Sequence, residues 1–193
     1  MIVVELFHEL LPSSGSILDI GCGYGFMPYM LHFASPQRSI TGIDYDEQKI
    51  ATANHNFSKT DAVHFVHANV MEFPFENYDA IVMMDILHYL QPEQQKIVIE
   101  KCIRHIKPGG LIIIRDGNKD LAKRHRGTAL TEVFSTEIVG FNKTSGKGLF
   151  FLSGSTIKEI AASHRLECRE IDETTYTSNI IFVLKRAGNN GTL

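Results

Sequence analysis

Short apolar runs and stretches of helical spacing alternate along the first 116 residues of the chain. Each run is continuously apolar and bounded by turn residues, a pattern typical of strands covered on both faces of a parallel sheet. The alternation of strand and helix predicts a doubly wound α/β fold with right-handed crossovers. The predicted strands are Ser16–Ile20, Ser39–Asp44, Val63–Val66, Ala80–Met84 and Leu111–Arg115, and the predicted helices are about Phe26–Ala34, Asp46–Phe57 and Pro92–Ile106.

The pattern breaks after Asp116. From Gly117 to Ser155 the chain is rich in Gly, Thr, Ser, Lys and Phe and shows no clean period over most of its length, which is too long for an ordinary connection. This segment is either an inserted lid or a disordered tract. Its aromatic residues favour a packed lid, because disordered segments are usually poor in aromatics. They are Phe134, Phe141, Phe150 and Phe151.

The C-terminal part returns to a regular pattern. Thr156–Arg165 has helical spacing, and Ser155 is its predicted N-cap. Leu166–Ile171 and Asn179–Leu184 predict two final strands, joined by a polar connection, that can form a hairpin at the end of the sheet.

The composition is that of an ordinary soluble globular protein, with 44% hydrophobic and 21% charged residues among 193. The length predicts a single domain over residues 1–187, with residues 117–155 as the lid insertion and residues 188–193 as a flexible tail. The N-terminus carries acidic residues where a signal peptide has positive charge, and the apolar runs are too short to span a bilayer. The cysteines are far apart and lack CxxC spacing, so we expect a cytoplasmic protein without disulfides or a zinc site. They are Cys22, Cys102 and Cys168.

The strongest motif is a glycine loop directly after the first predicted strand, Ile17-Leu18-Asp19-Ile20-Gly21-Cys22-Gly23-Tyr24-Gly25. Three glycines at alternate positions let the backbone turn sharply and approach a ligand more closely than a Cβ permits. The helix that begins behind the loop offers unpaired N–H groups to a polar or anionic ligand. The alternative is a tight turn without a ligand, but three spaced glycines exceed what a turn alone requires.

The spacing of this loop departs from the dinucleotide fingerprint GxGxxG, because Phe26 stands where that pattern has its third glycine. The chain also lacks a GxxxxGK[ST] phosphate loop. Asp44 ends the second predicted strand, 19 residues after Gly25. A carboxylate there can accept hydrogen bonds from both ribose hydroxyls of a nucleoside. The alternative for Asp44 is an acidic residue at the N-terminus of the following helix.

Together with two further stretches, these motifs resemble the class I S-adenosylmethionine-dependent methyltransferases over about residues 15 to 116. One stretch is Tyr78 to Leu90, with the sequence YDAIVMMDILHYL. The other is Lys107-Pro108-Gly109-Gly110, which we expect to end one helix and turn the chain into the next strand. The resemblance implies that the amino acid part of S-adenosylmethionine contacts Asp19, Gly21, Cys22, Gly23 and Gly25.

The resemblance also assigns the remainder of a cofactor site. Asp44 would hold the ribose, with Tyr45 beside the adenine. Asn69 and Val70 stand where the family often has an Asp followed by an apolar residue near the adenine amino group. Asn69 is a departure, although an amide oxygen can accept the same hydrogen bond. Asp85 begins the segment that lies beside the methionine moiety and faces the substrate.

The implied fold is a Rossmann-like sheet of seven strands, mostly parallel and doubly wound, with the last strand antiparallel. Barely 15 residues precede the first predicted strand, where many relatives carry one or two helices that close over the cofactor. Residues 1–11 could supply one short helix. Either the lid role falls on residues 117–155, or this chain is a piece of something longer.

His88 and Asp85 are the candidate catalytic residues. A sulfonium methyl is already activated, so the protein must mainly align the reactants and exclude water. His88 follows Asp85 by three residues and could act as a general base, because imidazole titrates near neutrality. The alternative is that His88 only positions the turn by hydrogen bonding to backbone. The remaining histidines show no metal-ligand spacing, and no metal is expected.

The identity of the methyl acceptor must be inferred from the insertion, which carries fewer recognisable motifs than the rest of the chain. The candidate substrate-binding residues are Arg124 and Arg126, in a basic run from Lys123 that could pair with a carboxylate or phosphate or form a solvated helix face. We expect a small-molecule or carrier-bound acceptor that enters under the lid. The net charge of -3 argues weakly against nucleic acid as a partner, and a homodimer stays open. Two alternative functions are an NAD(P)-dependent oxidoreductase and a non-catalytic S-adenosylmethionine-binding subunit. Phe26, in the place of the third glycine of the dinucleotide fingerprint, argues against the first.

Overall fold

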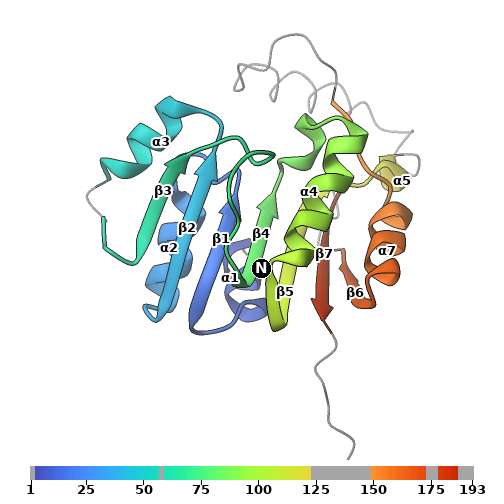
Figure 1. Cartoon of the computed structure of the whole chain (residues 1–193), viewed down its shortest axis with the longest axis horizontal. Coiled ribbons are helices and arrows are strands. Elements are labelled where there is room, and N and C mark those ends of the chain that lie inside the picture. Colours follow the sequence, from blue (N-terminus) through green and yellow to red (C-terminus); the bar gives the residue numbers. More distant parts are fainter. Residues whose placement is uncertain (1–2, 57–58, 123–148, 173–177, 187–193) are drawn as a thin grey trace, which may run out of the picture.

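The computed structural model describes residues 3–56, 59–122, 149–172 and 178–186. Its centre is a seven-stranded sheet with the strand order β3-β2-β1-β4-β5-β7-β6 (Figure 1). Strands β1 to β5 are parallel, and β7 is antiparallel to its two neighbours β5 and β6. The predicted fold class is therefore confirmed. The strands are β1 (Gly15–Ile20), β2 (Arg38–Asp44), β3 (Val63–His67), β4 (Tyr78–Met84), β5 (Ile106–Gly117), β6 (Leu166–Ile171) and β7 (Asn179–Arg186).

Helices cover both faces of the sheet, and each face has its own core. α1, α2 and α3 pack on one face, and α4 and α7 pack on the other (Figure 1). Successive strand residues alternate between the two cores: Ile17 and Ile113 face α1 and α2, whereas Leu18 and Ile112 face α4. This double burial explains why the strands are continuously apolar. The helices are α1 (Val3–Leu10), α2 (Phe26–Ala34), α3 (Glu47–Asn54), the 3₁₀ turn η1 (Leu87–Tyr89), α4 (Pro92–Arg104), α5 (Lys119–Ala122) and α7 (Gly154–Ser163).

Two local predictions are wrong. Lys107-Pro108-Gly109-Gly110 do not precede the strand but lie inside β5, where they bulge as the pairing with β4 shifts register beyond Tyr78. The N-cap of α7 is Ser153 rather than Ser155, because the Ser153 hydroxyl accepts a hydrogen bond from the N–H of Thr156 at 3.3 Å. The helix consequently begins earlier than the sequence pattern indicated.

The structure describes only the flanks of the predicted lid. Gly117 ends β5 and α5 follows it, while residues 149–153 lead into α7. Residues 123–148 lie outside the described residues, and so do Arg124 and Arg126 with two of the four phenylalanines. The predicted tail, residues 188–193, also lies outside them. Within the described ranges, no helix has the length and apolar character needed to cross a membrane.

Candidate cofactor and active site

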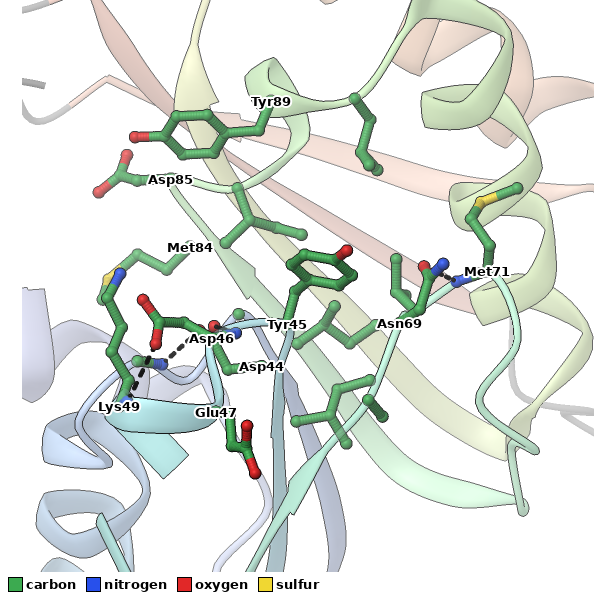
Figure 2. A pocket seen from close by; sticks show the side chains of 18 of the residues that line it. Asp44, Tyr45, Asp46, Glu47, Lys49, Asn69, Met71, Met84, Asp85 and Tyr89 are labelled. Carbon is green, nitrogen blue, oxygen red and sulfur yellow. Dashed lines mark hydrogen bonds between the residues drawn. The ribbon is translucent and has the colours of Figure 1, made fainter. Parts of the chain in front are cut away.

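A pocket opens at the carboxyl ends of β1 to β4. Its volume is about 690 Å³, within the range of about 300–1,000 Å³ that is common for small-molecule sites. Ligands of open α/β sheets bind at this edge, where the strand order reverses between β1 and β4. Figure 2 shows Asp46 and Lys49 on one side of the pocket, Asn69 and Met71 on the opposite side, and Tyr45 between them.

The glycine loop leaves β1 and crosses the end of β2. The N–H groups of Gly21 and Cys22 both donate to the carbonyl oxygen of Ile43, at 2.8 and 3.1 Å, which ties the loop to β2. Gly21 has a φ of 77°, and a Cβ there would lie 2.1 Å from the side chain of Ile86. Gly23 has a φ of 55°, and a Cβ there would meet no described atom within 4 Å. Gly23 lines the pocket, and the space beside its Cα is open.

Asp44 presents its carboxylate beside the glycine loop. One carboxylate oxygen accepts a hydrogen bond from the N–H of Gly23, and the other accepts one from the N–H of Asp46, both at 2.8 Å. These bonds fix the carboxylate, and each oxygen retains a lone pair for a ligand hydroxyl. The N-cap of α3 is Asp46, whose side chain accepts from the N–H groups of Gln48 and Lys49. Asp44 is therefore not the cap of that helix.

The structure brings together seven of the ten predicted cofactor residues around the pocket. These seven are Gly21, Gly23, Asp44, Tyr45, Asn69, Val70 and Asp85. The side chain of Cys22 packs instead into the core beneath α2, and burial raises the pKa of its thiol above the usual range. Gly25 is the N-cap of α2, and a Cβ there would lie 2.5 Å from the ring of Phe65. Asp19 is 2% exposed in β1, and burial, with a smaller contribution from Asp44, raises the pKa of its carboxyl to about 7.

Asn69 and Val70 follow β3 and form the wall opposite α3. The side-chain oxygen of Asn69 accepts a hydrogen bond from the N–H of Met71 at 3.1 Å. A carbonyl-type oxygen has two acceptor positions, so it can accept a further bond. Val70 is buried, whereas Tyr45 is 75% exposed, with its carbonyl oxygen 3.0 Å from Nε2 of His67. The wall thus combines an apolar surface with one free acceptor position.

Asp85 stands directly after β4 with a left-handed backbone, at a φ of 54°. Such a conformation is uncommon outside glycine and is often found at functional positions. Its carboxylate forms an ion pair with Arg115 of β5, and the side-chain amide of Asn179 of β7 lies 3.4 Å from the same carboxylate. Burial raises the pKa of Asp85, the positive charge of Arg115 opposes that shift, and the charge of Asp116 adds to it. The carboxylate of Asp85, fixed by Arg115, therefore lies at the β4 side of the pocket.

His88 lies in η1, beneath residues 149–153. Its Nδ1 lies 2.6 Å from a carboxylate oxygen of Asp116, and its backbone N–H donates to the other oxygen at 3.3 Å. The ring is 3% exposed, and Phe151 covers it with a centroid distance of 5.3 Å. Nε2 is buried and has no hydrogen-bond partner among the described residues. Because Nδ1 faces a carboxylate, it donates the hydrogen bond, and Nε2 is the ring nitrogen that has no partner among the described residues. The imidazole thus bonds a carboxylate rather than backbone.

The sequence interpretation missed Arg115 and Asp116. A signal was available, because Asp85 and Asp116 directly follow the predicted strands Ala80–Met84 and Leu111–Arg115. The residues that follow two parallel neighbours meet at one edge of the sheet. No group of metal-ligating side chains with three or more members occurs in the described part of the chain.

Comparison with known proteins identifies the family. The profile described as "Methyltransferase domain" matches residues 17–110. The tRNA N(3)-methylcytidine methyltransferase Mettl2 of Drosophila melanogaster is 27% identical over 186 residues, which cover 83% of this chain and 57% of that protein. The ubiquinone biosynthesis O-methyltransferase of Rickettsia typhi is 28% identical over 158 residues, which cover 80% of this chain and 61% of that protein. The chain therefore spans less than two thirds of the length of these relatives.

A solved structure of an O-methyltransferase family protein from Burkholderia thailandensis has the same fold. The TM-score is 0.74 at 19% identity, over 96% of this chain and 55% of that one. The residues matched by the profile include the glycine loop, Asp44, Asp85 and His88. The prediction of the family and of its cofactor was based on these motifs. The expected enzyme class is thereby confirmed. Residues 17–110 of this chain therefore form a methyltransferase domain, and the fold around them is shared with the O-methyltransferase structure.

Proposed function

We propose that this chain binds S-adenosylmethionine in the pocket at the ends of β1 to β4 and catalyses transfer of its methyl group to an oxygen acceptor. The observation that carries the proposal is the juxtaposition of Gly23 and Asp44. The first leaves open space beside the pocket, and the second holds an oriented carboxylate within hydrogen-bond distance of the same loop. A nucleoside with an amino acid arm needs both features. The carboxylate accepts hydrogen bonds from the ribose hydroxyls, and the open space lets the backbone approach the ligand closely.

Each wall has a separate role in this proposal. Asp44 accepts hydrogen bonds from the ribose hydroxyls, and Asn69 and Val70 contact the adenine. Gly21 and Gly23 leave room for the amino acid arm, and Asp85 faces the end from which the methyl group departs. The cofactor supplies a methyl group that is already activated by a sulfonium. The protein's task is then to align an acceptor and keep water out.

His88 is the proposed general base, acting through Nε2. Asp116 holds the ring through Nδ1 at 2.6 Å, which fixes both its orientation and its tautomer. A neutral imidazole with a free Nε2 can take the proton of a hydroxyl or phenol as the oxygen attacks. Phe151 lies over the ring, so the acceptor reaches Nε2 only when residues 149–153 shift or open.

The relatives leave two acceptor classes to compare. Their names include a tRNA N(3)-methylcytidine methyltransferase and a ubiquinone biosynthesis O-methyltransferase. The N3 atom of cytidine carries a lone pair and no proton, so its methylation requires no base. A hydroxyl must lose its proton, and for this the His88–Asp116 pair is suited. The pair favours an oxygen acceptor on a small or carrier-bound molecule, and tRNA is the second candidate. Arg124 and Arg126 remain proposed contacts to an acidic group of the acceptor.

The test is a calorimetric titration of the chain with S-adenosylhomocysteine and, separately, with NAD. We expect saturable binding of the first and none of the second. Binding of NAD alone would overturn the proposal in favour of an oxidoreductase. Affinity for the nucleoside without methylation of any acceptor, across phenols, hydroxy acids and tRNA, would instead indicate a non-catalytic binding subunit.

A further inference from the structure

One wall of the pocket is a single turn of chain between β3 and β4. The carbonyl oxygen of Asn69 accepts from the N–H groups of Glu72 and Phe73, at 3.0 and 2.8 Å, and the Asn69 side chain caps the N–H of Met71. Ala68 to Met71 line the pocket. An isolated turn of this kind is not stable in water, because ordering it costs more than its few hydrogen bonds return. Its position must therefore be fixed from outside.

Lys101 of α4 lies at the other end of this turn. Its ammonium donates to the carbonyl oxygens of Val70, Met71 and Phe73, at 3.0, 3.2 and 2.7 Å. The same nitrogen lies 4.4 Å from the centroid of the Phe75 ring, a cation–π contact. A lysine ammonium has three donors, and here each has its own carbonyl acceptor. Burial lowers the pKa of Lys101, as expected for an ammonium partly withdrawn from water.

The helix that carries Lys101 is itself fixed. Its neighbours Val98, Ile99 and Cys102 are fully buried in the core between α4 and the sheet. The ammonium therefore connects a rigid element to a turn that has little stability of its own. The turn in question also holds Asn69 and Val70, the proposed adenine contacts.

We infer that Lys101 is a positioning residue for recognition of the cofactor's base. By holding the carbonyls of Val70 and Met71, it fixes the backbone from which the edge of the adenine is read. This inference rests on the proposed function, because it assigns the base to this wall of the pocket. Without the ammonium, the three partly buried carbonyl oxygens of Val70, Met71 and Phe73 lose their donor, and the turn loses this attachment to α4.

The experiment measures base selectivity rather than affinity alone. The dissociation constants of S-adenosylhomocysteine and S-inosylhomocysteine are compared for the wild type and for Lys101→Met. We expect about tenfold weaker binding of S-adenosylhomocysteine by the variant and a smaller ratio between the two ligands. Lys101→Arg, which retains charge and several donors, should recover part of the ratio. Lys96→Met, on the exposed face of the same helix, should leave both constants unchanged.

The outcomes separate this inference from the function on which it rests. A wild type that binds neither ligand overturns both. A wild type that prefers the adenine ligand, with Lys101→Met keeping the full preference, overturns the inference alone. If Lys101→Met does not fold, Lys101→Leu, which also lacks a donor, serves in its place, and an undiminished preference in that variant overturns the inference as well.

Discussion

Single residues carry the chemistry of this site, and Asp19 is the one whose protonation can be measured most directly. Its carboxyl is 2% exposed, and burial raises its pKa from 3.8 to about 7. The folded chain therefore binds a proton that the unfolded chain releases near pH 4. The stability contributed by this proton is complete below about pH 4 and is lost as the pH rises through 7.

The substitution Asp19→Asn keeps the shape and removes the titration. Relative to the variant, the wild type should lose up to about 4 kcal/mol of unfolding free energy between pH 4 and pH 8. Urea denaturation of both proteins at several pH values measures this difference. A gap between the two proteins that does not change with pH would show that Asp19 titrates normally.

His88 offers a second test at this scale. His88→Gln removes the base but keeps a side chain that can bond Asp116. With a hydroxyl or phenol acceptor we expect kcat to fall by about 10²- to 10⁴-fold, while the affinity for S-adenosylhomocysteine stays unchanged. Equal losses with a hydroxyl acceptor and with tRNA cytidine would contradict a role in proton removal.

At the scale of elements, the attachment of α1 depends on one buried side chain. Arg38, at the start of β2, is 1% exposed, and its guanidinium donates to the carbonyl oxygens of His8, Leu11, Pro12 and Leu31. These carbonyls lie in and just after the last turns of α1 and α2, where the helix dipoles favour a cation. Arg38 thus fastens the two helices to each other and to the sheet.

Arg38→Met should therefore lower the unfolding free energy by about 3 kcal/mol or more, since it leaves several buried carbonyls without a donor. Arg38→Lys keeps the charge but has fewer donors, so its unfolding free energy should lie between those of the wild type and Arg38→Met. Chemical denaturation provides the comparison, with Arg104→Met as the control, because the ion pair that this arginine makes within the described residues is an exposed one with Glu100. A loss of less than 0.5 kcal/mol, about the size of a surface effect, would show that water replaces the guanidinium at no cost.

Across the whole molecule, the sequence predicted best what a local pattern encodes. The strands were identifiable because both faces of the sheet are buried, and the site was identifiable because Gly21, Gly23 and Asp44 adjoin strand ends. Contacts between distant segments could not be read in this way. The pairing of His88 with Asp116 depends on which strands are neighbours, and the inward turn of Cys22 depends on backbone angles that a spacing does not specify.

The final prediction concerns the stability of the entire fold on binding. The pocket is assembled from the ends of four strands, so a ligand there stabilises the sheet against unfolding by mass action. At a concentration of about 100 times Kd, S-adenosylhomocysteine should contribute about 2.7 kcal/mol, which corresponds to a rise in Tm of about 5–10 °C for a chain of this size. Asp44→Ala should abolish most of this rise, because the ribose loses its acceptor. Asp61→Ala, which changes an exposed acid that does not line the pocket, should retain the rise. Scanning calorimetry of the three proteins with and without ligand decides the matter, and an Asp44→Ala protein that gains as much Tm as the wild type would place the nucleoside elsewhere than between β1 and β2.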